Sequence, residues 1–258
     1  MAPRTTTDAA LAEIVGFLDE YLDVDGFPDY ANALNGLQVA GPERVRRFAV
    51  AVDASESVIE SVRDRADLLI VHHGLFWSGL QPLTGPHFRR VKALTESGTA
   101  LYSAHLPLDG HPEVGNAAVL ARKLGLATPE PFGRYRGTHI GCCGTVAATP
   151  LADLAASLAA MTGDRVRTLP GGPDEVTDVG IVTGGGASML PEAAGRGLDV
   201  LITGEASHHH AIDAAEMGVS VLLGGHYATE VWGVRAVMDL LEDRFGIEGC
   251  FVDSPTGL

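Results

Sequence analysis

The feature that most limits how this chain can fold is an order of strands and helices that occurs twice along it. Near-continuous runs of Val, Ile, Leu and Ala predict strands at residues 48–53, 66–74 and 99–105, and again at 179–185, 198–204 and 219–225. Helical patterns fill the segments between them. Strands that alternate with helices and lack polar alternation are typical of a parallel sheet covered on both faces. The sequence therefore predicts an α/β fold of two similar lobes with mostly parallel sheets.

Lobe one is expected at about residues 1–130 and lobe two at about residues 175–258, with residues 131–174 joining them. The joining segment holds a possible strand at 138–148, a helix at 150–161 and a short strand at 165–169. The repeated order reflects either internal duplication or the convergent use of the same strand–helix order in α/β proteins, and we favour duplication.

The charge of the chain excludes one class of partner. Its 258 residues include 33 acidic and 18 basic side chains, a formal net charge of -15, and its lysines are Lys92 and Lys123. Binding to a nucleic-acid backbone requires clustered Lys and Arg. We therefore expect no nucleic-acid partner, whereas arginine contacts to the phosphate of a small substrate stay open.

The N-terminal segment and the cysteines indicate a cellular setting. Residues 1–22 lack the apolar core of a secretory signal and predict an amphipathic helix with Asp8 as its N-cap. No apolar run reaches the ~20 residues that a membrane span needs. Cys142, Cys143 and Cys250 fit neither a disulfide framework nor a zinc motif, so we interpret the adjacent pair as ordinary reduced residues in a strand. We expect a cytoplasmic protein without a membrane partner.

Histidines and carboxylates follow the predicted strands at the ends where open α/β sheets bind ligands. The residues at these positions are His72, His73, His105, Asp109, His226 and Glu230. Taken singly, each has a structural interpretation: a core or exposed histidine, a turn aspartate, or a glutamate on a helix face. Together, two histidines, an aspartate and a His/Glu pair would supply five ligands for two metal ions, and a carboxylate can bridge such ions. The combination therefore favours a metal site.

Other polar positions allow more than one interpretation. His105 could be a metal ligand, an outer-shell donor or a proton shuttle, and we favour the outer shell. The consecutive histidines 208–210 form either the polar start of a helix or part of a substrate pocket. Residues Gly184–Ser188 predict a tight turn rather than a phosphate loop, because they lack the Walker lysine and the full dinucleotide fingerprint.

Five segments of the chain resemble the NIF3-like family, also called GTP cyclohydrolase 1 type 2. They are NGLQVAG (35–41), LLIVHHGLFW (68–77), YSAHLPLDGHPEVGNAAVLARKLGL (102–126), VLITGEASHH (200–209) and GGHYATE (224–230). They cover nearly the whole chain in the family's order. The resemblance implies a single NIF3-like domain of two α/β lobes, a dinuclear metal centre between the lobes, and a toroidal homohexamer. The short segment between the halves predicts no inserted PII-like domain.

The resemblance also implies roles for individual residues. His72 and His73 would each bind a different metal ion, Asp109 would bind one ion and His226 the other, and Glu230 would bridge the two. Two divalent ions per protomer are expected, from among Zn, Fe, Mn, Co and Ni.

Three further residues would act beside the metals. His105 would lie next to the centre as an outer-shell group or proton relay, whereas Glu205 and His209 would contact a small-molecule substrate. Glu205 stands where many relatives have Asp, which changes the reach of the side chain but not its charge.

The leading functional hypothesis is a dinuclear metal-dependent hydrolase that acts on a nucleotide or another small cyclic or phosphorylated metabolite. The family name implies hydrolytic opening of the GTP purine ring, although no residue singled out here specifies guanine or triphosphate. The alternative is a non-catalytic metal-binding or regulatory assembly protein with the same ligands. An exchangeable coordination position would distinguish the enzyme from the alternative.

Overall fold

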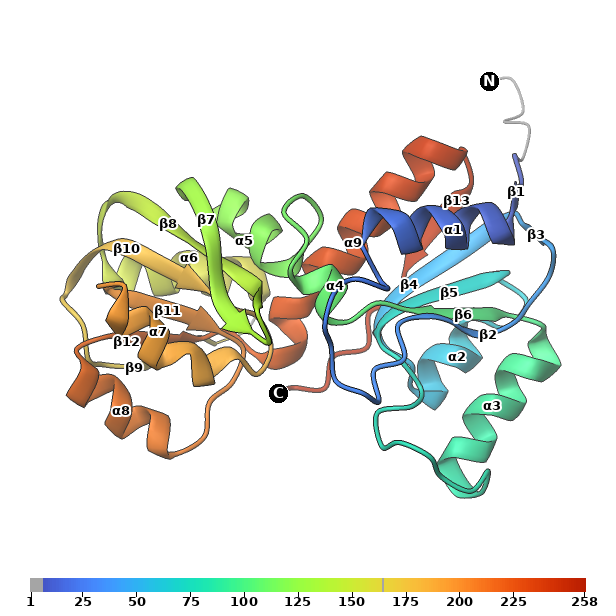
Figure 1. The fold of residues 1–258 in the computed structure, drawn as a ribbon, viewed down its shortest axis with the longest axis horizontal. Helices are drawn as coiled ribbons and strands as arrows, with labels where there is room; N and C mark the ends of the chain where they lie inside the picture. The colour runs from blue at the N-terminus through green and yellow to red at the C-terminus, as the bar shows by residue number, and fades with distance from the viewer. Residues whose placement is uncertain (1–6, 164) are drawn as a thin grey trace. The chain divides into compact units, whose positions relative to one another are not determined.

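The computed structural model describes residues 7–163 and 165–258, which form two compact units, each with its own main sheet (Figure 1). Unit 1 comprises the described residues up to Leu108 together with Val234–Ser254, and unit 2 comprises Asp109–Gly233 and Pro255–Leu258. These boundaries differ from the expected lobes, because strands and a helix within residues 131–174 complete the sheet and core of unit 2. Helix α9 (His226–Phe245) contributes residues to both units.

The main sheet in the described part of unit 1 has five strands. Their order is β13 (Glu248–Phe251), β4 (Arg47–Asp53), β5 (Leu68–His73), β6 (Ala100–Ser103) and β2 (Gly36–Val39). The first four are parallel, and β2 is antiparallel to β6. A short antiparallel pair, β1 (Ala9–Ala10) with β3 (Arg44–Val45), accompanies this sheet. The predicted parallel arrangement of the three strands in the first repeat is confirmed.

Helices cover the sheet of unit 1 because its strands are apolar on both faces. Figure 1 shows α2 (Glu56–Val62) and α3 (Gly85–Ser97) on one face and α1 (Leu11–Tyr21) on the other. Ile59 and Leu94 from α2 and α3 share a buried cluster with Leu69 of β5. The side chain of Ser55 caps the start of α2 by accepting a hydrogen bond from the backbone N–H of Val58.

The predicted N-cap of the first helix is wrong. Helix α1 begins at Leu11 with Ala10 in the N-cap position, and no side chain caps it. The carboxylate of Asp8 instead accepts a hydrogen bond from the guanidinium of Arg44. Residues 9–10 pair with β3, so the chain is extended where Asp8 would have had to approach the helix.

The sheet of unit 2 has six strands within the described residues. Their order is β7 (Ala127–Tyr135), β8 (Thr138–Pro150), β10 (Glu175–Ile181), β11 (Val200–Thr203), β12 (Ser220–Leu223) and β9 (Arg167–Leu169). The central strands β10, β11 and β12 are parallel, as the second repeat predicts, and the outer strands are antiparallel to their neighbours.

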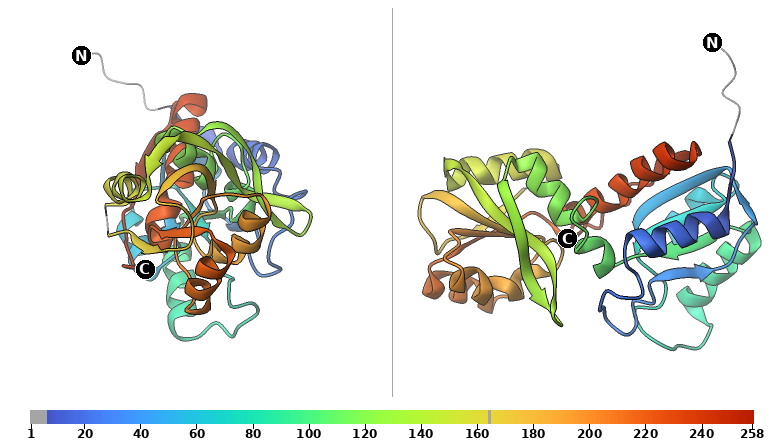
Figure 2. Two further views of the ribbon diagram at one scale, coloured as in Figure 1. Left: turned by 90° about the vertical axis from the view of Figure 1, so that its left-hand side faces the viewer. Right: turned by 45° about the horizontal axis from the view of Figure 1, so that its top comes forward.

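Side chains alternate across the sheet of unit 2 and form two separate apolar clusters. Ile202 faces the cluster that includes α5 (Asn116–Leu124) and α6 (Leu151–Thr162), whereas Leu201 faces α7 (Leu190–Gly195) and α8 (His209–Met217). Figure 2 shows these helix pairs on opposite sides of the sheet. Cys142 and Cys143 lie in β8 as free thiols, one in each cluster, which confirms their expected place in a strand.

The two units repeat one pattern at their centres, three consecutive parallel strands with intervening helices. Its origin by duplication stays a prediction. Among residues 7–163 and 165–258, no helix combines the length and apolar character needed to cross a lipid bilayer.

Candidate metal centre

Strand β5 ends in His72 and His73, the first two predicted ligands. The ring of His72 is fully buried, and its Nδ1 lies 3.0 Å from the carbonyl oxygen of Ala104. The Nδ1 of His73 lies 2.9 Å from Oδ1 of Asp53, the residue opposite it on β4. The two ring centroids are 4.7 Å apart. The strand end therefore lets both imidazoles contribute to one site.

His105 follows β6 and joins this pair. Its Nδ1 donates to Oδ1 of Asp29 at 2.9 Å, and its backbone N–H donates to Oδ1 of Asn35 at 2.8 Å. One ring nitrogen each from His72, His73 and His105 lie within 4.8 Å of one another, close enough to surround a metal ion. The indole of Trp77 stands perpendicular to the His105 ring at 4.5 Å between centroids and restricts its rotation.

In unit 2, glycines follow the parallel strands β10, β11 and β12. Backbone hydrogen bonds between these glycines continue the pairing of the strands. The backbone N–H of Gly204 donates to Gly184 O, and that of Gly225 donates to Gly204 O. Gly184 has a φ of +59°, and a Cβ there would overlap the Glu230 carboxylate. A Cβ on Gly204 would lie 2.7 Å from the Cα of His226. Only glycine allows this close approach. In the segment predicted as a tight turn, residues 184–188, the chain enters a 3-10 helix at Gly186–Met189.

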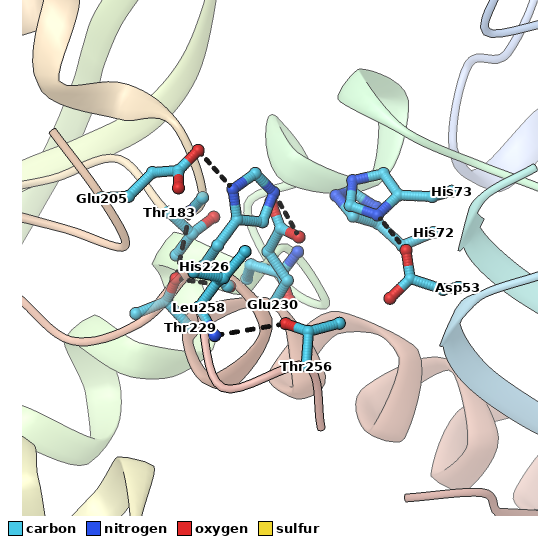
Figure 3. Close-up of polar contacts among 12 residues, drawn as sticks. Asp53, His72, His73, Thr183, Glu205, His226, Thr229, Glu230, Thr256 and Leu258 are labelled. Carbon is cyan, nitrogen blue, oxygen red and sulfur yellow. Dashed lines mark hydrogen bonds and ion pairs between the residues drawn. The ribbon is translucent and has the colours of Figure 1, made fainter. Parts of the chain in front are cut away.

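Helix α9 begins with His226 and presents Glu230 one turn later on the same face. The Nδ1 of His226 lies 3.0 Å from Oε1 of Glu205, and its Nε2 lies 3.3 Å from Oε2 of Glu230 (Figure 3). Glu230 is buried. Its hydrogen bond and charge, with those of Glu205, outweigh the effect of burial and raise the pKa of His226 to about 9. A metal ion binding at Nε2 would have to displace a proton.

Asp109 ends the short helix α4 (Leu106–Asp109) and is held by side chains of unit 2. Its Oδ1 accepts hydrogen bonds from Nδ2 of Asn116 at 2.8 Å and from Oγ1 of Thr183 at 3.3 Å. Asn116 is fully buried, and its own Oδ1 accepts the backbone N–H of Gly233 in α9 at 2.6 Å. The carboxylate of Asp109 is therefore fixed in a buried, polar environment.

One arrangement is common to the four histidines described above. In every case an oxygen atom of the same unit accepts a hydrogen bond from Nδ1, as described above for His72, His73, His105 and His226. Metal-binding histidines in proteins usually have such a partner on the ring nitrogen that does not bind the ion. The partner fixes the tautomer and leaves Nε2 as the ligand atom. These side chains therefore fit a metal site in both the type and the orientation of their donor atoms.

The family model of Duf34/NIF3 (NGG1p interacting factor 3) matches residues 9–256. The chain belongs to the DUF34/NIF3 family. A relative from Deinococcus radiodurans, 45% identical over 248 residues, covers 95% of this chain and 94% of its own length, and one from Halobacterium salinarum is 50% identical over 237 residues, covering 89% and 93%. Both carry the name GTP cyclohydrolase 1 type 2 homolog.

Solved structures agree with this family assignment. The protein TTHA1606 from Thermus thermophilus is 41% identical, has a TM-score of 0.89, and covers 97% of this chain and 100% of its own. The protein ybgI, described as of unknown function, is 35% identical with a TM-score of 0.90 over the same shares of the two chains. The NIF3-like α/β fold that the five sequence segments implied is thereby confirmed.

The two residues predicted to contact the substrate, Glu205 and His209, are both exposed. Glu205 is exposed and accepts the hydrogen bond from His226, so it orients a candidate ligand. His209 is exposed at the first residue of α8, where its ring is tilted against that of His210 with 4.0 Å between centroids. This position matches the polar helix start considered for residues 208–210. A role of Glu205 and His209 toward substrate stays a prediction.

Sequence reasoning missed the residues that hold the candidate ligands. Asp53 was the easiest to find, because it is a carboxylate at the carboxyl end of a predicted strand next to β5. Asn116 is a polar residue on the otherwise apolar buried face of a helix, which is a weaker signal. Asp29 lies in a loop 76 residues before His105, and neither spacing nor periodicity connects the two.

Proposed function

We propose that this chain is a metal-dependent hydrolase with two divalent ions bound by His72, His73, Asp109, His226 and Glu230. The observation that supports the proposal is the shared orientation of the imidazoles, each with Nδ1 held by an oxygen acceptor and Nε2 left as the donor atom. The donor set contains imidazole and carboxylate without thiolate. Such a set suits Zn, Fe, Mn, Co or Ni.

Two divalent ions held together would polarise a substrate bond and make a water molecule a nucleophile near neutral pH. The side chains of this chain would perform the other parts of the reaction. Glu205 holds the ring of His226, and Asn116 with Thr183 holds the carboxylate of Asp109. His105 would accept the proton that the attacking water loses. We assign Glu205 and His209 to the substrate side of the site.

For the substrate, we propose a nucleotide or another small cyclic or phosphorylated metabolite. The name of the relatives suggests GTP, whose purine ring would be opened with release of formate. The net charge of -15 would repel a triphosphate unless the bound metals and nearby arginines reversed the local potential. A small phosphoester or cyclic amide fits the same ligands with less repulsion.

The test is an untargeted screen of the metal-reconstituted protein against nucleotides, phosphoesters and cyclic amides, with products followed by mass spectrometry. Turnover that requires metal and is lost in His105→Asn would support a hydrolase. Formate release from GTP would support the cyclohydrolase, whereas turnover of another compound without ring opening of GTP would reject that substrate. His139→Asn is a matched control, because His139 lies in β8, outside the proposed centre.

Exchange at the metal would separate the enzyme from a non-catalytic metal-binding or regulatory assembly protein. A hydrolase needs a coordination position that solvent or an anion can enter. Relaxation of water protons on the manganese-loaded protein, with azide as competitor, would report such a position. A centre without exchangeable solvent would contradict the hydrolase.

We also propose that the chain forms a homohexamer and works in the cytoplasm. The family resemblance is the basis for the assembly. Native mass spectrometry and light scattering of the full chain would test it, and a stable monomer or dimer at micromolar concentration would contradict it.

A further inference from the structure

Asp29 gathers hydrogen-bond donors on both oxygens of its carboxylate. Its Oδ1 accepts from the backbone N–H of Tyr30 at 2.6 Å and from Nδ1 of His105 at 2.9 Å. Its Oδ2 accepts from Nδ2 of Asn35 at 2.8 Å and from the backbone N–H of Leu106 at 2.9 Å. The side chain is only 6% exposed. A group that receives four donors and offers none is an ionised carboxylate.

This arrangement determines which nitrogen of His105 carries the proton. An ionised carboxylate can only accept, so Nδ1 of the neutral imidazole must be the N–H donor. Nε2 then carries the lone pair. A carboxylate plays the same part toward histidine in serine hydrolases, where it fixes the tautomer and stabilises the imidazolium that forms when the ring takes a proton.

The surroundings hold the ring of His105 beside the candidate ligands. Asn35 connects the two partners, because it donates to Asp29 and accepts the backbone N–H of His105. Trp77 stands edge-on to the ring. His72 and His73 contact the same ring, with centroids 4.9 and 5.6 Å away.

We propose that Asp29 is a positioning residue that holds His105 in the Nδ1–H tautomer, so that Nε2 is the proton acceptor beside the metal-binding histidines. The role of Nε2 as proton acceptor rests on the proposed function. In that step the water O–H bond breaks, its proton forms a bond to Nε2, and the oxygen keeps the electron pair for attack. The tautomer that Asp29 imposes on His105 does not depend on any reaction.

The first experiment measures the tautomer directly. Full-length protein with ¹⁵N-labelled histidine is studied by long-range ¹H–¹⁵N NMR at about pH 8 with a chelator, where an ordinary imidazole is neutral. The signal of His105 is identified by its loss in His105→Asn, whose amide Nδ2 can still donate to Asp29. We expect a protonated Nδ1 and an unprotonated Nε2. A wild-type His105 with its proton on Nε2 would overturn the proposal even if no variant of Asp29 folds.

The second experiment replaces the acceptor. In Asp29→Asn, the side-chain NH₂ replaces one of the two oxygen acceptors and cannot accept a hydrogen bond. Where the NH₂ faces Nδ1 of His105, that nitrogen must accept, so we expect His105 to gain a population protonated on Nε2. Asp19→Asn is the matched control, because Asp19 accepts a hydrogen bond from buried Tyr102 in the same unit. The control should leave the His105 signals unchanged. A folded Asp29→Asn protein with the wild-type tautomer would contradict the proposal.

The third experiment separates a proton acceptor from a metal ligand. We expect His105→Asn reloaded with zinc to keep the wild-type number of ions per chain, and a loss of one ion would show that His105 is a ligand instead. Failure of the wild type to bind zinc would contradict the proposed function and the role of Nε2 as proton acceptor. The NMR comparison would still decide whether Asp29 fixes the tautomer.

Discussion

The Nδ1 of His73 and Oδ1 of Asp53 lie 2.9 Å apart across the register of two parallel strands, so the sheet itself sets the orientation of a candidate ligand. Removing this partner in Asp53→Ala should weaken metal binding about 10–100-fold, because His73 would lose its fixed tautomer and ring position. Competitive titration with a zinc indicator measures the change. Glu56→Ala is the control, since Glu56 pairs with Arg89 at the surface of α2. Equal affinities in the two variants would contradict this account of Asp53.

Gly184→Ala should abolish metal binding in unit 2 and destabilise the fold. The φ of +59° costs about 1–2 kcal/mol for any residue with a Cβ, and the added Cβ would displace Glu230. Gly218→Ala separates these effects, because Gly218 has a φ of +73° and open space around its Cβ position. The control should lose stability in urea denaturation but keep its metal content. Full metal occupancy in Gly184→Ala would show that Glu230 tolerates displacement.

Asn116→Leu should destabilise the protein by about 1–3 kcal/mol, because it leaves the buried backbone N–H of Gly233 without its acceptor and removes one of the hydrogen bonds to the Asp109 carboxylate. Urea denaturation in the presence of a chelator measures this loss independently of bound metal. Asn32→Leu, at an exposed position, is the comparison. A loss no greater than that of the comparison would indicate that water replaces the Asn116 side chain.

Stability should depend on the ionisation of Asp29 in acid. Burial opposes its ionisation, but hydrogen bonds from His105, Asn35 and Tyr30 outweigh burial and hold its pKa below the ordinary 3.8. The carboxylate therefore contributes stability that is complete above the unfolded pKa and is lost as the pH falls through the lower folded value. The difference in unfolding free energy between wild type and Asp29→Asn should shrink as the pH falls from about 5 to below about 4. A constant difference across this range would contradict the assignment.

The parallel centres of both sheets could be predicted because apolar runs and helical periodicity report burial directly. Strand β7 could not, since Pro129 and Pro131 argue against a strand. The structure places β7 at the edge of its sheet. An edge strand has a neighbour on one side, so a proline whose nitrogen faces the other side loses no hydrogen bond of the sheet. Strand β2 is only four residues long and includes polar Gln38, so it has no clear apolar pattern.

The candidate ligands could be predicted from their positions after strands, but their partners could not. Spacing along the chain identifies His226 and Glu230, which lie one helical turn apart. Asp29 reaches His105 from a distant loop, and Thr183 reaches Asp109 across 74 residues. Such pairs are set by tertiary packing, and a single sequence carries no local signal for them.

The central claim is that the five proposed ligands bind two divalent ions. The most direct test is the metal content per chain, by inductively coupled plasma mass spectrometry, of reconstituted wild type, His73→Ala and Glu230→Ala, with His209→Ala as a folded control. The account predicts two ions in the wild type and the control, and fewer than two in both ligand variants. Two ions retained in His73→Ala and Glu230→Ala, or none bound by the wild type, would contradict it.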